Sequence, residues 1–314
     1  MKKFDAVVIG DVNIDLVVVG CNQIPQPGQE IFVENIRMHV GGGAALFTIS
    51  LAKLGLHAAF NGVLGDDLYG HYIREQFARH GIDTSLIRTS PTNHTGITIA
   101  INPELDRSFI TYAGSNSELQ VGDLDIAQVA LGRHAHVTGY RGRRNHDEFI
   151  AMVKKLKETG VTVSCDVGWD DTGEWHAGVF ELMRYIDVFL MNETEAFHYT
   201  GIEHIDDSLK YMGGFCRHVV IKLGPKGAIA MKDGWQLAHS GFVVDVVDTT
   251  GAGDSFNAGY LYGYLTGQNV ESCLLYGNVC GAMSVGSYGG STGTPDREGL
   301  AAFIRQNEDS CRAF

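Results

Sequence analysis

One run of the chain, residues 246–259, combines glycines and carboxylates at the expected beginning of a helix. It reads Val-Val-Asp-Thr-Thr-Gly-Ala-Gly-Asp-Ser-Phe-Asn-Ala-Gly, so a strand-like stretch ending at Val247 leads into a small-residue turn and then into an amphipathic stretch from about Gly253. The turn of Gly251, Ala252 and Gly253 carries little side-chain bulk, which lets the backbone approach a ligand closely. The first N–H groups of a helix lack partners and lie at the positive end of its dipole, so this turn can hold an anion.

Asp254 lies beside that anion site, where its carboxylate can accept a proton from an attacking hydroxyl group. A helix N-terminus of this kind can stabilise a transferring phosphoryl group without a lysine. Capping by Asp248 or Asp254 is the alternative interpretation, but a cap needs one polar residue and not this ordered set. The run therefore indicates phosphoryl transfer to a hydroxyl, with Asp254 as the base. Because a helix N-terminus favours a charged carboxylate, we expect a lowered pKa for Asp254.

The elements that must position this run alternate between strands and helices. Short β-branched runs predict strands, and apolar residues spaced three or four apart predict helices. This alternation favours an α/β fold of three layers, in which a mostly parallel sheet is covered by helices on both faces. The predicted strands are residues 6–9, 135–138, 161–165, 188–191 and 218–221. The predicted helices are residues 44–54, 147–158, 254–265 and 271–285.

Residues 13–40 and 95–112 break the alternation, because both regions read as strands without an intervening helix. The second region reads as a hairpin that turns at Asn102-Pro103-Glu104. We expect the two regions to form a small β-sheet lid that excludes water, which would otherwise compete as the phosphoryl acceptor. No linker or internal repeat is evident, so residues 1–314 are predicted to form a single α/β domain with this lid. An exposed sheet edge invites pairing, so we also expect a homodimer joined through the lids.

The overall composition argues against several partners. The formal net charge is −13, whereas a protein that binds a nucleic-acid backbone needs a basic footprint. The N-terminal apolar stretch is too short and too interrupted for a signal peptide or a membrane span. The six cysteines have wide, irregular spacings, which indicates reduced thiols and a cytoplasmic protein. His134 and His136 lie two apart without a third ligand, so a packed or solvated pair is expected rather than a metal site.

Residues 248–254, with Phe256 and Gly259, resemble the C-terminal signature of the ribokinase-like (PfkB) sugar kinases. Further stretches resemble motifs of the same family, in the same order and over nearly the whole chain. They are residues 10–15 of the first strand, the pair Gly41-Gly42, the G-x-x-G-x-D-x-x-G stretch at 62–70, the N-x-x-E motif at 192–195 and the nucleotide-site turn at 222–227. The resemblance implies a ribokinase-like fold and an ATP-dependent kinase that phosphorylates a sugar or a sugar-like polyol.

The resemblance also implies roles for individual residues. Asp254 would be the base, and residues 251–253 would form the anion hole. Glu195 and Asn192 would act through water to hold Mg²⁺ near the phosphates, although this helix-start pattern also permits a capping role. The other implied positions are Lys222, Gly224, Gly227, Gly253 and Asn278 at the nucleotide, Asp11, Asn13, Asp15, Gly41 and Gly42 at the sugar, and Asp248, Thr250, Ser284, Ser287, Gly289 and Gly293 around a monovalent cation such as K⁺.

The sugar end of the site departs from the family pattern. Leu46 stands where many members carry an Asn that helps to hold the sugar, and residues 166–169 begin like the family's Asp-x-Asn-x-Arg stretch but lack its Asn and Arg. One alternative is a nucleoside kinase of the same fold, in which Leu46 and Phe47 provide an apolar contact for the base. Another is a sugar-binding protein that has lost catalysis. The retained Asp254 argues against that last alternative.

Three arginines follow the predicted strand at 135–138, namely Arg141, Arg143 and Arg144. Ligands of parallel sheets bind beyond the carboxyl ends of the strands, and a guanidinium group grips a carboxylate, phosphate or sulfonate at two points. Arg37 and Arg107, in the predicted lid, would add to this patch. The arginines therefore favour an acidic sugar as substrate, the alternative being solvated surface charges that balance the acidic chain.

Overall fold

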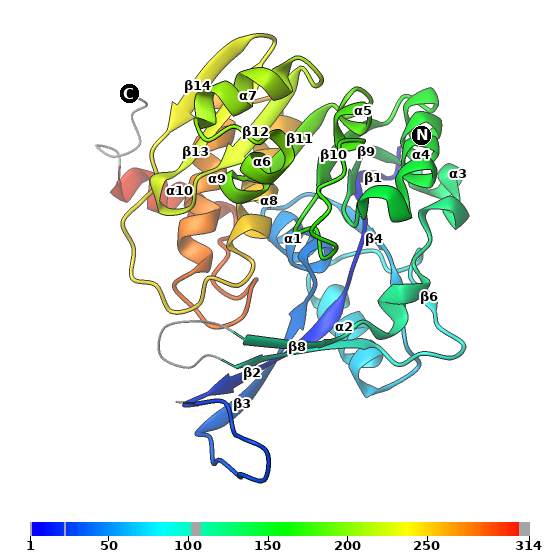
Figure 1. Ribbon diagram of the computed structural model, residues 1–314, viewed down its shortest axis with the longest axis vertical. Coiled ribbons are helices and arrows are strands. Elements are labelled where there is room, and N and C mark those ends of the chain that lie inside the picture. The colour runs from blue at the N-terminus through cyan, green and yellow to red at the C-terminus, as the bar shows by residue number, and fades with distance from the viewer. Residues whose placement is uncertain (1, 22, 102–107, 308–314) are drawn as a thin grey trace.

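A large twisted sheet forms the centre of the molecule in the computed structural model, which describes residues 2–21, 23–101 and 108–307 (Figure 1). The strand order is β14-β13-β12-β11-β10-β9-β1-β4, and all neighbours from β4 to β12 are parallel, whereas β13 and β14 add an antiparallel edge. The bounds are β1 Phe4–Ile9, β4 Ala58–Asn61, β9 Gly132–Val137, β10 Thr162–Asp166, β11 Val188–Asn192, β12 His218–Lys222, β13 Ala228–Lys232 and β14 Trp235–His239.

All five predicted strands are present, within three residues of their expected bounds, because these short β-branched runs are buried on both faces as parallel strands require. The strands β4, β13 and β14 had no such signal. One expected strand is wrong: residues 241–248 are irregular, and the run that ends at Val247 does not join a sheet.

Helices cover both faces of the sheet, which confirms the predicted three-layer architecture. One face packs against α1 Gly43–Lys53, α2 Leu68–Arg79, α8 Ala252–Leu265 and α9 Val270–Ser284. The other packs against α3 Ile126–Val129, α4 His146–Glu158, α5 Val179–Met183, α6 Glu193–Thr200 and α7 Ile205–Gly213. The last helix, α10 Arg297–Gln306, packs on α9, and short elements complete the fold: β5 Val63–Leu64, β6 Arg88–Thr89, η1 Gly114–Glu118, η2 Val121–Asp123, η3 Gly142–Arg144 and η4 Gly224–Lys226.

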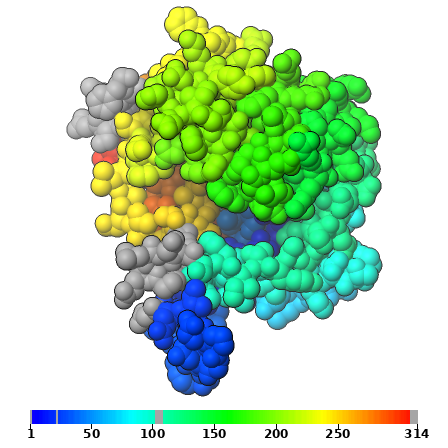
Figure 2. Space-filling view, viewed as in Figure 1, coloured from blue at the N-terminus to red at the C-terminus, as the bar shows by residue number. Residues whose placement is uncertain are grey.

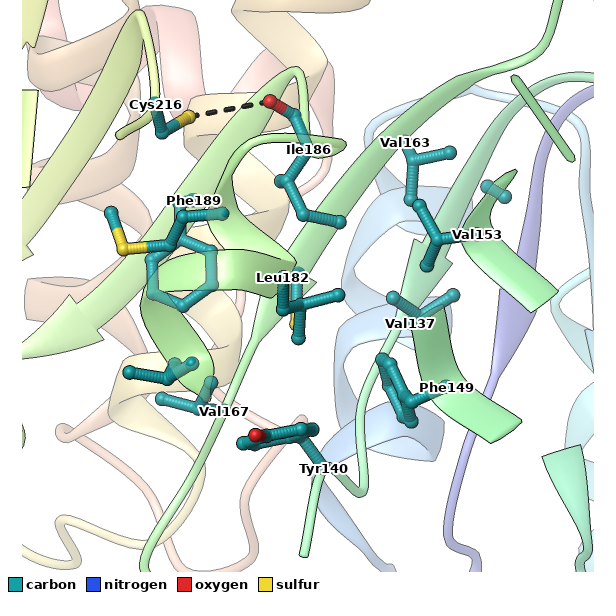
Figure 3. Packing of buried hydrophobic residues seen from close by; sticks show 14 of the residues in the cluster. Val137, Tyr140, Phe149, Val153, Val163, Val167, Leu182, Ile186, Phe189 and Cys216 are labelled. Carbon is teal, nitrogen blue, oxygen red and sulfur yellow. Dashed lines mark hydrogen bonds between the residues drawn. The ribbon is translucent and has the colours of Figure 1, made fainter. Parts of the chain in front are cut away.

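The core beneath α4 and α5 shows how the sheet is held to its helices (Figure 3). Apolar side chains of neighbouring strands meet those of the helices, as where Val137 and Val163 lie near Val153 and Phe149 of α4. The thiol of Cys216 donates to the Ile186 carbonyl there. Five cysteines in the described part of the chain are free and buried, as expected for reduced thiols.

A smaller sheet carries both regions that were predicted as a lid. Its order is β3-β2-β7-β8, with β2 Asn13–Val19, β3 Asn35–Gly41, β7 Gly96–Ile101 and β8 Ser108–Tyr112. The hairpin of β7 and β8 is antiparallel as expected, while its predicted tip at 102–104 lies outside the described residues. This sheet lies at one end of the large sheet, and the end formed by β2 and β3 projects from the body (Figures 1 and 2).

Candidate active site

Several polar side chains gather where the parallel strands end. Because β1, β10, β11 and β12 point the same way, the residues at or just after their ends meet at one edge of the sheet. These residues are Asp11, Asp166, Asn192 and Lys222. Figure 2 shows a hollow at this edge, between the green loops that follow the strands and the blue and cyan smaller sheet. The site therefore lies in the place that parallel sheets use for ligands.

The anion turn has the geometry that the sequence indicated. Gly251 is the N-cap of α8 and has a left-handed backbone with φ 71°, and no side chain of the described residues caps this helix. A Cβ on Gly251 would lie 2.5 Å from the carbonyl oxygen of Gly290, so only glycine fits. A Cβ on Gly253 would lie 3.4 Å from Lys222 Nζ, which places this lysine beside the turn. The first turn of α8 is thus bordered by the backbone of Gly290 and by the ammonium group of Lys222.

Asp254 faces the N-terminus of α1 across the site. A Cβ on Gly43 would lie 3.1 Å from Asp254 Oδ1, so the two helix N-termini nearly touch. Removal from water raises the pKa of Asp254 to about 8, and the negative charge of Asp166 adds to this, while Lys222 opposes it. The expected lowering of this pKa is therefore wrong, because burial and neighbouring carboxylates outweigh the helix dipole. A carboxylate with this pKa is a stronger base than an ordinary aspartate.

An ion pair that the sequence did not reveal lies next to Asp254. Lys222 Nζ donates to Asp166 Oδ2 over 2.7 Å, and the amide of Asn257 donates to the same oxygen. Burial alone would raise the pKa of Asp166 and lower that of Lys222, but their mutual attraction shifts each pKa the other way. Asn257 could have been found from its spacing, since it lies three residues after Asp254 on one face of α8.

Asn192 and Glu195 form a capping box at the start of α6. Glu195 N–H donates to Asn192 Oδ1, and Asn192 N–H donates to Glu195 Oε2, both over 2.8 Å. The capping interpretation is thus confirmed, and it uses one carboxylate oxygen of Glu195. Burial and then the charge of Asp166 raise the pKa of Glu195 to about 7. A buried carboxylate in such surroundings suits a nearby cation, although the described residues contain no cluster of three or more His, Cys, Asp or Glu that could hold a metal directly.

A cavity of about 590 Å³ opens beside the anion turn, between the η4 turn and helices α8 and α9. Of the six residues expected to bind the cofactor, it is lined by Lys222, Gly224, Gly227, Gly253 and Asn278 but not by Asn192. Asn278 holds the wall in place, because its amide donates to the carbonyls of His239 and Ser240 over 3.0 and 3.2 Å. Gly227 has φ 102° and packs against the His239 carbonyl, so a side chain cannot fit. Sequence reasoning missed the apolar wall formed by Phe242, Val243, Val244, Val246 and Val285.

The expected sugar residues also converge, but with different partners. Asp11 accepts hydrogen bonds from the backbone N–H groups of Gly43 and Ala44 over 3.0 and 3.3 Å, so its carboxylate caps α1. Asn13 donates to Asp15 Oδ1 over 2.7 Å, and both residues belong to β2. Burial raises the pKa of Asp15 to about 6 although this hydrogen bond opposes the shift.

Gly41 and Gly42 complete the sugar end at the junction of β3 and α1. The side chain of Asp15 packs against Gly41, and Gly42 has φ 92° with the Asp11 carbonyl 2.7 Å from where its Cβ would be. Both positions therefore require glycine. Leu46 and Phe47 do not line an open site, because Leu46 packs against Gly290 and Phe47 stacks on the ring of His136, with both side chains buried.

The residues expected around a monovalent cation lie together behind the anion turn. The carboxylate of Asp248 accepts from the N–H groups of Thr250 and Gly289 over 2.9 and 3.0 Å. A Cβ on Gly293 would lie 2.8 Å from the Ser284 carbonyl, and Ser287 belongs to the same turn after α9. The ring of His39, from β3 of the smaller sheet, lies against Gly289, and this contact was not foreseen.

Only part of the predicted arginine patch is available to bind an anionic substrate. Arg143 pairs with Glu174, and Arg144 lies 3.3 Å from Asp171, so both are balanced by neighbouring acids. Arg37 lies over the ring of Tyr288 at 4.7 Å, and Arg107 lies outside the described residues. Arg141 is exposed, and its backbone N–H donates to Asn145 Oδ1.

His134 and His136 form a packed pair, as the sequence favoured. Ser164 Oγ lies 2.7 Å from His134 Nε2 and 2.8 Å from His136 Nδ1, inside the sheet. Burial lowers the pKa of His134 to about 3 and that of His136 to about 4, so both rings stay neutral. Their rings are therefore part of the buried packing of the sheet.

Comparisons with known proteins agree with this geometry. The model of the pfkB family of carbohydrate kinases matches residues 3–297. The chain is 30% identical to an ATP-dependent ribose-1-phosphate kinase of Halopiger xanaduensis, covering 96% of this chain and 98% of the relative. It is 28% identical to a ribokinase of Haemophilus influenzae, covering 95% and 97%.

Solved structures show the same fold. A ribokinase of Arabidopsis thaliana in complex with ribose and ATP superposes with a TM-score of 0.84 at 26% identity, covering 96% of this chain and 99% of that one. No helix within the described residues is long and apolar enough to cross a membrane. The matched family model and the relatives together establish that this chain belongs to the pfkB family and is an ATP-dependent carbohydrate kinase.

Proposed function

We propose that this enzyme transfers the γ-phosphoryl group of ATP to a hydroxyl of a sugar or sugar-like polyol, with Asp254 as the base. The observation that carries the proposal is the position of Asp254 in the first turn of α8. There it lies between the nucleotide cavity and the N-terminus of α1, in a turn that no described side chain caps. A ligand oxygen beside Asp254 would face the N–H groups of residues 251–253.

In the proposed reaction the acceptor hydroxyl gives its proton to an Asp254 carboxylate oxygen as its own oxygen bonds to the γ-phosphorus. The bond from that phosphorus to the bridging oxygen breaks, and ADP departs with the electron pair. The three peripheral oxygens of the transferring group share negative charge, which the N–H groups of the anion turn and Lys222 offset. The raised pKa of Asp254 makes its carboxylate a stronger base toward the hydroxyl proton than an ordinary aspartate.

Mg²⁺ fits the acidic edge of the site next to Glu195. Burial and then the negative charge of Asp166 raise the pKa of Glu195, and Asn192 orients its carboxylate through the capping box. Since the described residues offer no direct metal cluster, Asn192 and Glu195 would hold the ion through water. When bound, the ion neutralises charge on the ATP phosphates.

The substrate end consists of Asp11, Asn13, Asp15, Gly41 and Gly42, beneath the lid. We place the sugar against Asn13 and Asp15, with Asp11 ordering the N-terminus of α1 instead of contacting the sugar through both oxygens. An acidic sugar remains the favoured class because Arg141 is exposed beside the strand ends, and because one relative is named for ribose 1-phosphate, an anionic sugar. The apolar base contact expected for the nucleoside alternative loses its support, because Leu46 and Phe47 are buried against Gly290 and His136.

Three further features belong to the same proposal. Exposed apolar side chains on the smaller sheet, Ile36, Phe109, Ile110 and Tyr112, favour a homodimer through the lids. The grouping of Asp248, Thr250, Ser284, Gly289 and Gly293 supports a K⁺ site that stabilises the turn before α8. We also propose a single domain with a lid, which is supported by the packing of residues from both sheets in one apolar cluster, and a cytoplasmic location, which is supported by the free, buried cysteines.

A panel of sugars, sugar acids, sugar phosphates and nucleosides, assayed for ADP formation with MgATP, tests the proposed function. We expect turnover with at least one sugar and more with its acidic form. Asp254→Asn on the best substrate separates a kinase from a sugar-binding protein, since only a kinase has activity to lose. Preference for a nucleoside over every sugar would refute the substrate class.

A further inference from the structure

Lys53 lies outside the nucleotide cavity and the proposed sugar site, yet it holds the loop behind the anion turn. It is the last residue of α1 and is half-buried. Its Nζ donates to the carbonyl oxygens of Ser291 and Thr292 over 3.1 and 3.3 Å. Hydrogen bonds from an ammonium group are stronger than those between neutral groups, so this lysine fixes two consecutive carbonyls of the loop.

That loop, residues 286–294, is in direct contact with the anion turn. The carbonyl oxygen of Gly290 lies 2.5 Å from the place of a Cβ on Gly251, so the two backbones touch without an intervening side chain. Ser255 Oγ donates to the same carbonyl over 3.4 Å and lies 2.8 Å from Thr294 Oγ1. A shift of the loop would therefore move Gly251 and the first turn of α8 with it.

Helix α1 connects the loop to the catalytic carboxylate. Its first residue, Gly43, faces Asp254, and Leu46 one turn later packs against Gly290. Ser50 Oγ lies 3.2 Å from Thr294 Oγ1, and Lys53 completes the row of contacts. The helix thus touches the site at one end and clamps the loop at the other, with Lys53 as the charged contact.

We propose that Lys53 is a positioning residue, whose ammonium group holds the Ser291 and Thr292 carbonyls and so keeps Gly290 against Gly251 and the anion turn aimed at the transferring phosphoryl group. This rests on the proposed anion hole and adds a residue that touches neither ATP nor the sugar. Two carbonyl oxygens converge at this point, so the position needs a group with more than one N–H donor, which the Lys53 ammonium group supplies.

Lys53→Met, which keeps the chain length and removes the charge, tests the proposal in the full-length enzyme. We expect kcat on the best panel substrate to fall roughly 10- to 100-fold, as small misplacements of catalytic groups do, with KM for ATP changed less than about threefold. Calorimetry with MgADP and aluminium fluoride, a mimic of the transferring group, should show the same loss, while MgADP alone binds as in wild type. Lys155→Met, an exposed lysine on α4, is the matched control.

Chemical rescue keeps the test decisive if the methionine variant is poorly folded. Lys53→Ala should regain kcat in ethylammonium, which carries N–H donors, but not in tetramethylammonium at the same concentration, which carries none. Equal behaviour in the two salts, or a kcat of Lys53→Met within twofold of wild type, would overturn the proposal. Absence of turnover in the wild type would instead count against the proposed function, and the aluminium fluoride measurement would still decide the role of Lys53.

Discussion

Replacing Asp254 by Asn should remove activity and increase stability at the same time. The substitution keeps the size of the side chain and deletes the base, so turnover should fall roughly 10²- to 10⁴-fold. The gain in stability comes from burial, since the native structure holds this carboxyl in surroundings that raise its pKa from the ordinary 3.8 to about 8. The side chain of asparagine carries no charge, so its burial avoids the desolvation cost of a charged carboxylate.

The magnitude follows from the two pKa values. A group whose pKa is raised on folding contributes stability that is fully present below its unfolded pKa and is lost as the pH rises through the folded pKa. For Asp254 this window runs from 3.8 to about 8, so between pH 6 and pH 9 the wild type should lose about 2–3 kcal/mol that Asp254→Asn retains. The difference in free energy of unfolding should therefore widen with pH.

Urea unfolding of both proteins at pH 6 and pH 9, without nucleotide or Mg²⁺, measures this difference. Asp147→Asn supplies the control, because Asp147 also lies in the first turn of a helix, α4, but is exposed. That variant should show no comparable widening. The reasoning is refuted if Asp254→Asn is no more stable than wild type at pH 9, or if its turnover stays within about a factor of three.

Three further predictions concern other parts of the molecule. Glu195→Gln, which preserves the capping box, should raise the Mg²⁺ concentration for half-maximal turnover roughly 10-fold, and an unchanged Mg²⁺ titration would exclude the proposed role of Glu195. Arg141→Ala should raise KM for an acidic sugar far more than KM for ATP. Arg144→Ala should not, because Arg144 is already paired with Asp171, and equal effects of the two substitutions on KM for the sugar would contradict the assignment. The neutral histidines His134 and His136, whose pKa values are lowered to about 3 and 4, contribute stability that is lost as the pH falls below their unfolded value of 6.5, by about 2 kcal/mol each at pH 5. Urea unfolding of His136→Gln against wild type at pH 7 and pH 5 checks this, and a gap that fails to change by pH 5 would show that His136 is not held neutral.

The sequence correctly predicted those parts of the fold and site that depend on residues close together in the chain. The glycines of residues 251–253 and the carboxylate of Asp254 follow from one helix start, and the buried strands follow from their β-branched runs. Residues 241–248 show the limit of such reasoning. Their apolar, β-branched character suited a strand, but a strand needs a partner, and these side chains instead form the wall of the nucleotide cavity.

The electrostatics of the site could not be predicted in this way, because they arise between residues far apart in the chain. Asp166 ends β10, Lys222 ends β12 and Asn257 belongs to α8, and only the folded sheet brings the three together. The pKa of Asp254 depends on the same neighbours and on burial. Local reasoning considered only the helix dipole and left out burial and the charge of Asp166, and so predicted a shift of the wrong sign.

The charges at the strand ends explain why the active site opposes the stability of the fold. Burial and then the negative charge of Asp166 raise the pKa values of Asp254 and Glu195, Asp11 adds to the shift of Asp254, and Lys222 is the one cation among the causes of these two shifts. Lys222 forms an ion pair with Asp166. Asp254 and Glu195, the two carboxylates assigned to proton and metal chemistry, have no such partner among the described residues. Without bound ligands, the buried negative charges of such a site destabilise the folded state. The apolar core on both faces of the sheet must offset this loss of folding free energy. The raised pKa values of Asp254 and Glu195 and their proposed functions therefore have the same physical origin.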